Sequence, residues 1–224
     1  MVKKKVKKKI SKKVSDRETK QLIGFLVITG LVFILFFGTY FGVRAQKHFD
    51  YEGAEWWIEG EREGWGDLTL YHGRYQVKTS TGKVITNMNL WLRNDPRENN
   101  ISSEVDFLED KIASNVIITF TDELMECKGR ALIVPQLSQA FGIGLPWTTT
   151  SGAVANQTTA ENLNLTYATC EDVGEETSVI LIQKGEESKV YSEEGCYTIQ
   201  YQDCDEAIKV SEKLILELIK QLNP

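Results

Sequence analysis

Histidine is scarce in this chain of 224 residues, which contains only His48 and His72. A histidine-based triad therefore has at most two candidate bases. The sequence also lacks a Gly-x-Ser-x-Gly elbow, a His-Glu-x-x-His pair and a phosphate-binding loop. These are the usual signatures of α/β-hydrolases, zinc peptidases and P-loop nucleotide-binding proteins. We expect no cofactor and no resident metal.

Charge is missing from residues 22–43, LIGFLVITGLVFILFFGTYFGV, a run of 22 residues. As a helix, this run extends roughly 33 Å at 1.5 Å per residue, enough to cross the hydrocarbon core of a lipid bilayer. We predict a single transmembrane helix over residues 22–43, with the rest of the chain divided between its two sides.

Charge differs strongly between those two sides. Residues 1–20 hold ten Lys or Arg against two acidic residues, a net charge of +8, whereas residues 44–224 have a net charge of −14. Positive charge next to a span stays cytoplasmic. We therefore expect residues 1–21 to form a basic cytoplasmic tail near anionic lipid headgroups, and the larger C-terminal part to be extracytoplasmic.

Two alternatives to this topology follow from the same residues. A cleaved signal peptide would have a shorter apolar core and a small-residue cleavage site, which Val43-Arg44-Ala45-Gln46 does not provide. A pilin-type assembly signal is the second alternative. The basic tail also has an alternative role, contact with nucleic acid or the ribosome, but no aromatic residue interleaves the lysines, which argues against base stacking.

All four cysteines lie after the span: Cys127, Cys170, Cys196 and Cys204. An even number fits disulfides in an oxidising compartment, whereas the spacings of 42, 25 and 7 intervening residues do not resemble a zinc site. Four cysteines allow three pairings. We prefer Cys127 with Cys170, because each would follow a strand at the same end of a sheet. The remaining Cys196–Cys204 pair would be held too far apart by a straight strand between them.

Three glycosylation sequons also follow the span, at Asn100, Asn156 and Asn164. Each lies in or beside an expected loop, which is where an acceptor asparagine must be. They are candidates for modification in an extracytoplasmic domain.

The first part of the external chain contains an aromatic connector and then a hairpin. Residues 44–66 are rich in aromatic residues and glutamate, and we assign them to a juxtamembrane connector before a domain at 67–224. Alternating apolar residues in 74–79 and 84–92 predict two strands of a β-hairpin.

The segment Arg93-Asn94-Asp95-Pro96-Arg97 ends the second strand of that hairpin. Asn, Asp and Pro favour a turn for local backbone reasons. An alternative is a site in which Arg93 and Arg97 hold an anion with their guanidinium groups.

A buried strand is predicted at 115–120, followed by a helix from Glu123 to about Val134 and a second helix that starts at Pro135 and ends at Gly142. We interpret residues 141–163 as a long irregular loop of the kind that is functional or disordered. Trp147 in this loop either packs into the body or is exposed as a contact for a partner.

The sequence after this loop predicts four short strands, at 165–169, 178–183, 189–191 and 196–201. The chain then ends in an amphipathic helix capped by Asp203, with one apolar stripe and the charged residues elsewhere. The charged set is Lys209, Glu212, Lys213, Glu217 and Lys220. These elements predict an α/β or α+β fold: one domain built on a single mixed sheet.

Carboxylates at expected strand ends, Asp95, Asp122 and Asp203, stand where a site on a sheet would lie. Each also has an explanation as a turn or helix cap, so we assign no catalytic residue.

A resemblance to a family rests on two parts of the sequence: Leu92 to Asn99, LRNDPREN, and Cys196-Tyr197 with the helix after it. With its basic tail and single span, the chain resembles small uncharacterised single-span archaeal surface proteins. The resemblance covers about a fifth of the chain and implies no activity.

We therefore expect a type II membrane-anchored, non-enzymatic interaction module that binds an envelope or surface protein. An envelope hydrolase or transferase that uses carboxylates, and a subunit of a surface assembly, are the alternatives.

Overall fold

The structure is a computed structural model that describes residues 2–60, 69–78, 82–107 and 111–222. The chain separates into two compact units, Met1–Lys47 and His48–Pro224.

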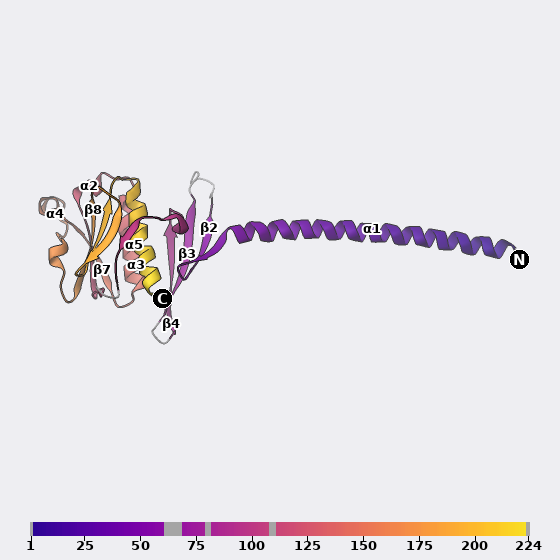
Figure 1. Ribbon diagram of the computed structural model, residues 1–224, viewed down its shortest axis with the longest axis horizontal. Coiled ribbons are helices and arrows are strands. Elements are labelled where there is room, and N and C mark those ends of the chain that lie inside the picture. Colours follow the sequence, from indigo (N-terminus) through magenta and orange to yellow (C-terminus); the bar gives the residue numbers. More distant parts are fainter. Residues whose placement is uncertain (1, 61–68, 79–81, 108–110, 223–224) are drawn as a thin grey trace. The chain divides into compact units, whose positions relative to one another are not determined.

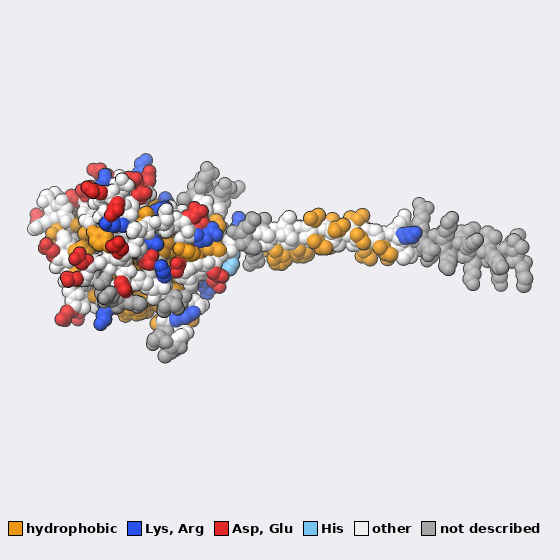
Figure 2. Space-filling model, in the orientation of Figure 1, with side chains coloured by type: hydrophobic (Ala, Val, Ile, Leu, Met, Phe, Trp, Pro, Cys, Tyr) orange, Lys and Arg blue, Asp and Glu red, His pale blue; other side chains and the backbone are white. Residues whose placement is uncertain are grey.

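The first unit is the helix α1 (Val2–Gln46). Within it, Thr19–Gly42 is a stretch of 24 residues that is long and apolar enough to cross a membrane, and 18 of its consecutive residues have a mean hydropathy of 2.5. Apolar side chains line this stretch in Figure 2. The apolar helix expected at 22–43 is therefore present, and the helix continues into the basic tail on one side and past Val43 on the other.

The second unit contains two sheets rather than the single mixed sheet expected, although its mixed α/β class is confirmed (Figure 1). The first sheet is antiparallel, in the order β1 (His48–Tyr51), β2 (Ala54–Glu59), β3 (Leu70–Lys78), β4 (Val84–Leu92). The second has six strands, in the order β5 (Ser102–Glu104), β9 (Lys189–Glu193), β10 (Cys196–Tyr201), β8 (Thr177–Lys184), β6 (Asn115–Phe120), β7 (Thr149–Val154). Strands β10, β8, β6 and β7 run parallel to one another.

Two long helices lie between the sheets, α3 (Arg130–Gly144) and α5 (Glu206–Leu222) (Figure 1). Both contribute to one hydrophobic cluster that also takes residues from both sheets. The shorter elements are η1 (Pro96–Glu98), α2 (Asp122–Met125), α4 (Gln157–Leu163) and η2 (Cys170–Asp172). Because one core joins the layers, the four-stranded sheet is an integral part of the fold.

The four-stranded sheet has one buried face and one open face, as alternation along its strands requires. The buried face carries Trp56, Tyr75, Met88, Leu90 and Leu92, each at most 2 % exposed. Gly73 lies opposite Trp56 on the neighbouring strand, and a Cβ there would come within 2.6 Å of the indole. Glycine is therefore needed at this position so that the indole can lie across β3.

Several boundaries differ from the sequence prediction. Residues 48–59, which we assigned to the connector, form β1 and β2 of the first sheet, while 61–66 lie outside the described residues. The β3–β4 hairpin is confirmed. So are the strands β6, β8, β9 and β10, but residues 165–169 form only an isolated bridge between Val154 and Tyr167.

The prediction of an irregular loop over 141–163 is wrong. The segment contains the end of α3, the edge strand β7 and the helix α4. Its Thr-rich and Gly-containing sequence obscured a strand that gains its order from pairing with β6. Pro135 does not start a helix either, because it lies inside α3.

The C-terminal helix is confirmed, and Asp203 Oδ1 accepts hydrogen bonds from the backbone N–H groups of Asp205 and Glu206 at its start. The prediction that Glu212 lies away from the buried face of this helix is wrong, because its side chain is fully buried. Since α5 has a layer on each side, its buried surface is wider than one stripe.

The disulfides join Cys127 to Cys204 and Cys170 to Cys196, with Cα–Cα distances of 5.1 and 5.5 Å. The preferred pairing of Cys127 with Cys170 is therefore wrong. Cys170 does not end a strand but lies in η2, beside the start of β10, whereas Cys127 lies between α2 and α3 near the start of α5.

Candidate ligand-binding face

Four rings form a row across the open face of the four-stranded sheet, one from each strand. The cross-strand register places His48 opposite Trp57, Trp57 opposite His72, and His72 opposite Trp91. Successive ring centroids lie 5.2, 5.5 and 4.2 Å apart, and the last pair is stacked within 6° of parallel. We call these four side chains the ring row. Cross-strand aromatic pairs of this kind stiffen a sheet.

His72 is the third ring of the row, and polar side chains also contact both nitrogens at the edge of its ring. Its Nδ1 lies 3.5 Å from Glu59 Oε1, and its Nε2 lies 3.4 Å from Asn89 Oδ1. Both polar partners come from the same open face, so the ring is fixed on four sides.

An open hollow of about 600 Å³ adjoins the ring row. Its lining residues are Trp57, Glu59, His72, Arg74, Asn87 and Asn89. They combine aromatic surface with a carboxylate, a guanidinium group and two amides, so the hollow offers both hydrogen-bond donors and acceptors. This is the composition of a site that recognises a polar ligand.

The backbone of β4 beneath this face is held from the core side. Gln139 Nε2 donates to the carbonyl of Asn89 at 2.9 Å, and Gln136 Nε2 donates to the carbonyl of Trp91 at 2.6 Å. Just beyond the strand, Glu212 Oε1 accepts from the N–H of Arg93 at 2.6 Å. Helices α3 and α5 therefore fix the strand that carries Trp91 and Asn89.

Glu212 is the most deeply buried carboxylate of this network. Besides the N–H of Arg93, it accepts hydrogen bonds from the backbone N–H and side-chain amide of Asn94, at 3.1 and 2.8 Å. Burial raises the pKa of Glu212 above its ordinary value of 4.5, while the hydrogen bonds from Arg93 and Asn94 act in the opposite direction.

The two arginines predicted as anion contacts have different surroundings. Arg97 forms a fork with Asp95, with Nε–Oδ1 and Nη2–Oδ2 distances of 2.9 and 2.6 Å, and its guanidinium group lies 3.8 Å from the centroid of the Phe49 ring. The same hydrogen bonds lower the pKa of Asp95. Arg97 is thus engaged in joining η1 to β1, whereas the side chain of Arg93 is exposed.

Trp147 lies between α3 and β7, with 54 % of its side chain exposed. It does not pack into the body, so the alternative of an exposed contact is the one that its position allows. It lies on the six-stranded half of the domain and contributes nothing to the ring row or its hollow.

The three sequon asparagines are all exposed. Asn156 is the most engaged, because its Oδ1 caps α4 by accepting from the N–H of Thr159 while its Nδ2 donates to Asp122. Asn100 Oδ1 accepts from Lys209. Asn164 ends α4 in the left-handed conformation with a φ of 52°.

The strand-end carboxylates each have local partners. Asp95 caps η1 and pairs with Arg97, Asp203 caps α5, and Asp122 Oδ2 accepts from Asn156 Nδ2 and Thr159 Oγ1 at 2.8 and 3.0 Å. Within the described part of the chain, no three or more His, Cys, Asp or Glu side chains are placed to hold one metal ion. The structure brings these carboxylates to three separate places.

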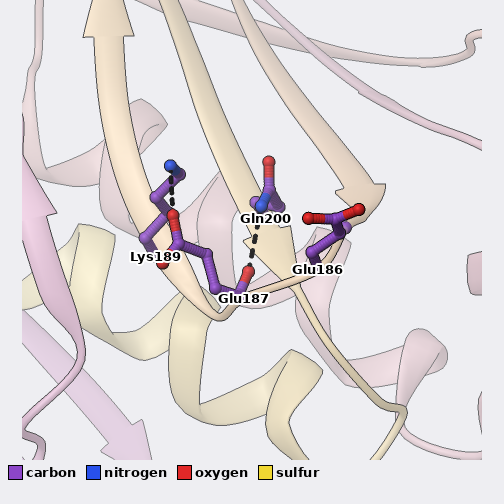
Figure 3. A pocket seen from close by; sticks show the side chains of 5 residues that line it. Glu186, Glu187, Lys189 and Gln200 are labelled. Atoms are coloured by element: carbon purple, nitrogen blue, oxygen red, sulfur yellow. Dashed lines mark hydrogen bonds and ion pairs between the residues drawn. The ribbon is translucent and has the colours of Figure 1, made fainter.

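A second polar hollow lies at the turn between β8 and β9 (Figure 3). Its side chains bond mainly within the turn: Lys189 Nζ lies 2.5 Å from Glu187 Oε1, and Gln200 Nε2 donates to the carbonyl of Glu187 at 3.0 Å. These bonds stabilise the connection from β8 to β9, which crosses the end of β10, the strand that lies between them in the sheet. The lining of the hollow includes no aromatic side chain.

Sequence reasoning missed the ring row, although a signal was present. The adjacent pair Trp56-Trp57 must point to opposite faces if residues 54–59 form a strand, which leaves one tryptophan open. Trp91 stands at an outward position of the predicted strand 84–92, between the inward Leu90 and Leu92. What the pattern could not supply was the register that aligns the four rings.

No protein-family model matches this chain, and neither the curated proteins nor the solved structures compared with it include a match.

Proposed function

We propose that the chain is a type II membrane-anchored interaction module, with its N-terminal tail in the cytoplasm and residues 48–224 on the outer side. The anchor is the Thr19–Gly42 stretch, preceded by a strongly basic tail. Two disulfides favour an oxidising compartment for the second unit.

The open face of the four-stranded sheet is the surface that holds the partner. The ring row is the observation that carries this proposal, because it keeps four rings exposed or half-buried beside a polar hollow on the open face of the sheet. Along the chain, the row begins at His48, six residues after Gly42. A partner in the envelope, close to the membrane, fits this position.

Binding is favoured over catalysis by the state of the ionisable groups. The carboxylates at the strand ends are held as caps and pairs, and Glu212 is enclosed by hydrogen-bond donors. A hydrolase or transferase would instead need an acid and a base converging on one open place.

Photo-crosslinking in intact cells tests the proposal. A photoreactive amino acid at the exposed position 76, opposite Asn87 on β3, would lie on the open face, and the same residue at the exposed position 163 serves as a control on α4. We expect one stoichiometric protein partner to be linked from position 76 and not from position 163. Linkage from position 163 alone, from neither position, or only to copies of the chain itself would overturn the proposal.

Topology is tested in the same cells with a C-terminal tag. An antibody added outside should reach the tag before the membrane is permeabilised. Access only after permeabilisation would place residues 48–224 in the cytoplasm and contradict the proposed orientation.

A further inference from the structure

Trp91 is the tryptophan of the ring row that is most open to a ligand. It stands on β4, the edge strand of its sheet, and the residue is 38 % exposed. His72 is its one ring neighbour in the row, at 4.2 Å, whereas Trp57 has a ring neighbour in both His48 and His72 and is half-buried. Trp91 is therefore the aromatic side chain on which we place a ligand.

Polar groups next to this ring suit a ligand rich in hydroxyl groups. Asn87, Asn89 and Trp91 share the open face of β4, and Arg74 is opposite Asn89 on β3. Amides donate and accept at once, and a guanidinium group donates in a fixed fork, so hydroxyls along an extended chain of sugar units could each find a partner. The C–H face of a sugar ring packs on an aromatic face in the same way as other apolar surface.

The charges in the hollow exclude the main competing ligands. Glu59 and Arg74 balance each other there, unlike the clustered Lys and Arg that bind phosphate or nucleic acid. The 44–224 segment has a net charge of −14, which repels anionic ligands at a distance. Residues that dominate a protein–protein interface lie in desolvated pockets, whereas this hollow is open and largely polar.

We infer that the open face binds an uncharged glycan chain, carried by an envelope glycoprotein, with one sugar unit packed on Trp91 and the hydroxyls of the neighbouring units held by Asn89, Asn87 and Arg74. The ligand class rests on the proposed function, because it names what the partner presents to the same face. The hydrogen bonds from Gln136 and Gln139 hold the backbone of Trp91 and Asn89 before the ligand arrives, which lowers the entropy cost of binding.

The test uses the full chain in detergent micelles on an array of immobilised oligosaccharides. The array carries neutral oligomers of glucose, mannose, galactose and N-acetylglucosamine, and uronic-acid and sulfated oligomers of the same lengths. We expect binding to at least one neutral series and not to its acidic counterparts. No binding to any neutral oligomer, or a preference for acidic ones, would overturn the inference.

Three variants locate the binding. Trp91→Ala should weaken it at least tenfold, which corresponds to about 1.4 kcal/mol, and Asn87→Ala about threefold. Trp147→Ala, which removes a more exposed tryptophan elsewhere, should leave it unchanged. Near-ultraviolet circular dichroism checks that the variants are folded. Equal weakening by Trp147→Ala, or no change with folded Trp91→Ala and Asn87→Ala, would contradict the site.

Mild periodate oxidation of the cells separates the two proposals, because it cleaves the vicinal diols of sugars. Loss of the crosslink from position 76 after periodate supports the glycan. If the crosslink persists and the array is silent, the interaction module stands and the glycan inference falls. If both the crosslink and the array signal are absent, both proposals fall.

Discussion

The two sheets of the second unit are built for different tasks. The six-stranded sheet has four adjacent parallel strands, and parallel sheets are covered on both faces. In β10, for example, every residue except Gln200 is buried. The four-stranded sheet is antiparallel and leaves one face open. The difference teaches where a surface site is possible in this fold: only the second kind of sheet can present a regular row of side chains.

The two halves also differ in their disulfides, because both disulfides lie in the half that contains the six-stranded sheet. Replacing Cys127 and Cys204 together by serine opens a loop with a sequence separation of 77. We expect a loss of about 4.5 kcal/mol in the free energy of unfolding from chain entropy, against about 3.5 kcal/mol for the Cys170 and Cys196 pair. Urea unfolding of the full chain in detergent measures both. A loss under 1 kcal/mol for either pair would remove the disulfides from the stabilising framework.

A tryptophan on the buried face of the four-stranded sheet should contribute much more to the free energy of unfolding than one on the open face. Trp56 is fully buried, so Trp56→Ala should cost about 4 kcal/mol in the free energy of unfolding. Trp91→Ala removes one stacked ring on the open face and should cost about 1 kcal/mol. Chemical denaturation compares the two variants. Equal costs would mean that the ring row is structural and not a free surface.

Glu212 joins the two halves, so its removal should weaken both. Glu212→Ala leaves the N–H groups of Arg93 and Asn94 without their acceptor and should cost about 2 kcal/mol in unfolding free energy near neutral pH. Glu212→Gln, which keeps one acceptor oxygen, should lose less.

The cost of Glu212→Ala should also depend on pH. The folded chain binds the Glu212 proton more tightly than the unfolded chain, because burial raises its pKa. The stabilisation that this proton gives the folded chain is therefore fully present below pH 4.5, the ordinary pKa of the group. It is lost as pH rises through the raised pKa. Unfolding measured from pH 4 to 8 should show the difference between wild type and Glu212→Ala shrinking as pH rises. A difference that grows with pH would contradict the assignment.

Asp95, the residue after Asn94, should show the opposite pH dependence of unfolding free energy. Its pKa is lowered from 3.8 by the hydrogen bonds from Arg97, so its contribution is present above that value and is lost as pH falls through the lowered pKa. Because the Arg97 side chain is 44 % exposed, we expect only about 0.5 kcal/mol from Asp95→Asn at neutral pH, and this cost should disappear as pH falls through the lowered pKa. Acid titration of unfolding free energy checks this, and a cost that persists in acid would implicate the turn itself.

The parts of the fold that were predictable from the sequence carry their signal in one short segment. The apolar run, the alternation in β4 and the cap at Asp203 each follow from side chains and local backbone geometry. The parts that were missed depend on distant neighbours. Thr149–Val154 is a strand because β6 lies beside it, and Glu212 is buried because a second sheet covers α5. The ring row required the register of four strands, which no single segment encodes.

The glutamine contacts of α3 also affect how the chain behaves among copies of itself. The carbonyls of Asn89 and Trp91 are already occupied by Gln139 and Gln136. An incoming strand that tried to extend the sheet past β4 would have to displace both amides, although exposed sheet edges readily recruit strands from other chains. With the membrane anchor proposed above, molecules would meet in two dimensions at high local concentration, and the two glutamines would protect the domain against fibril-like growth.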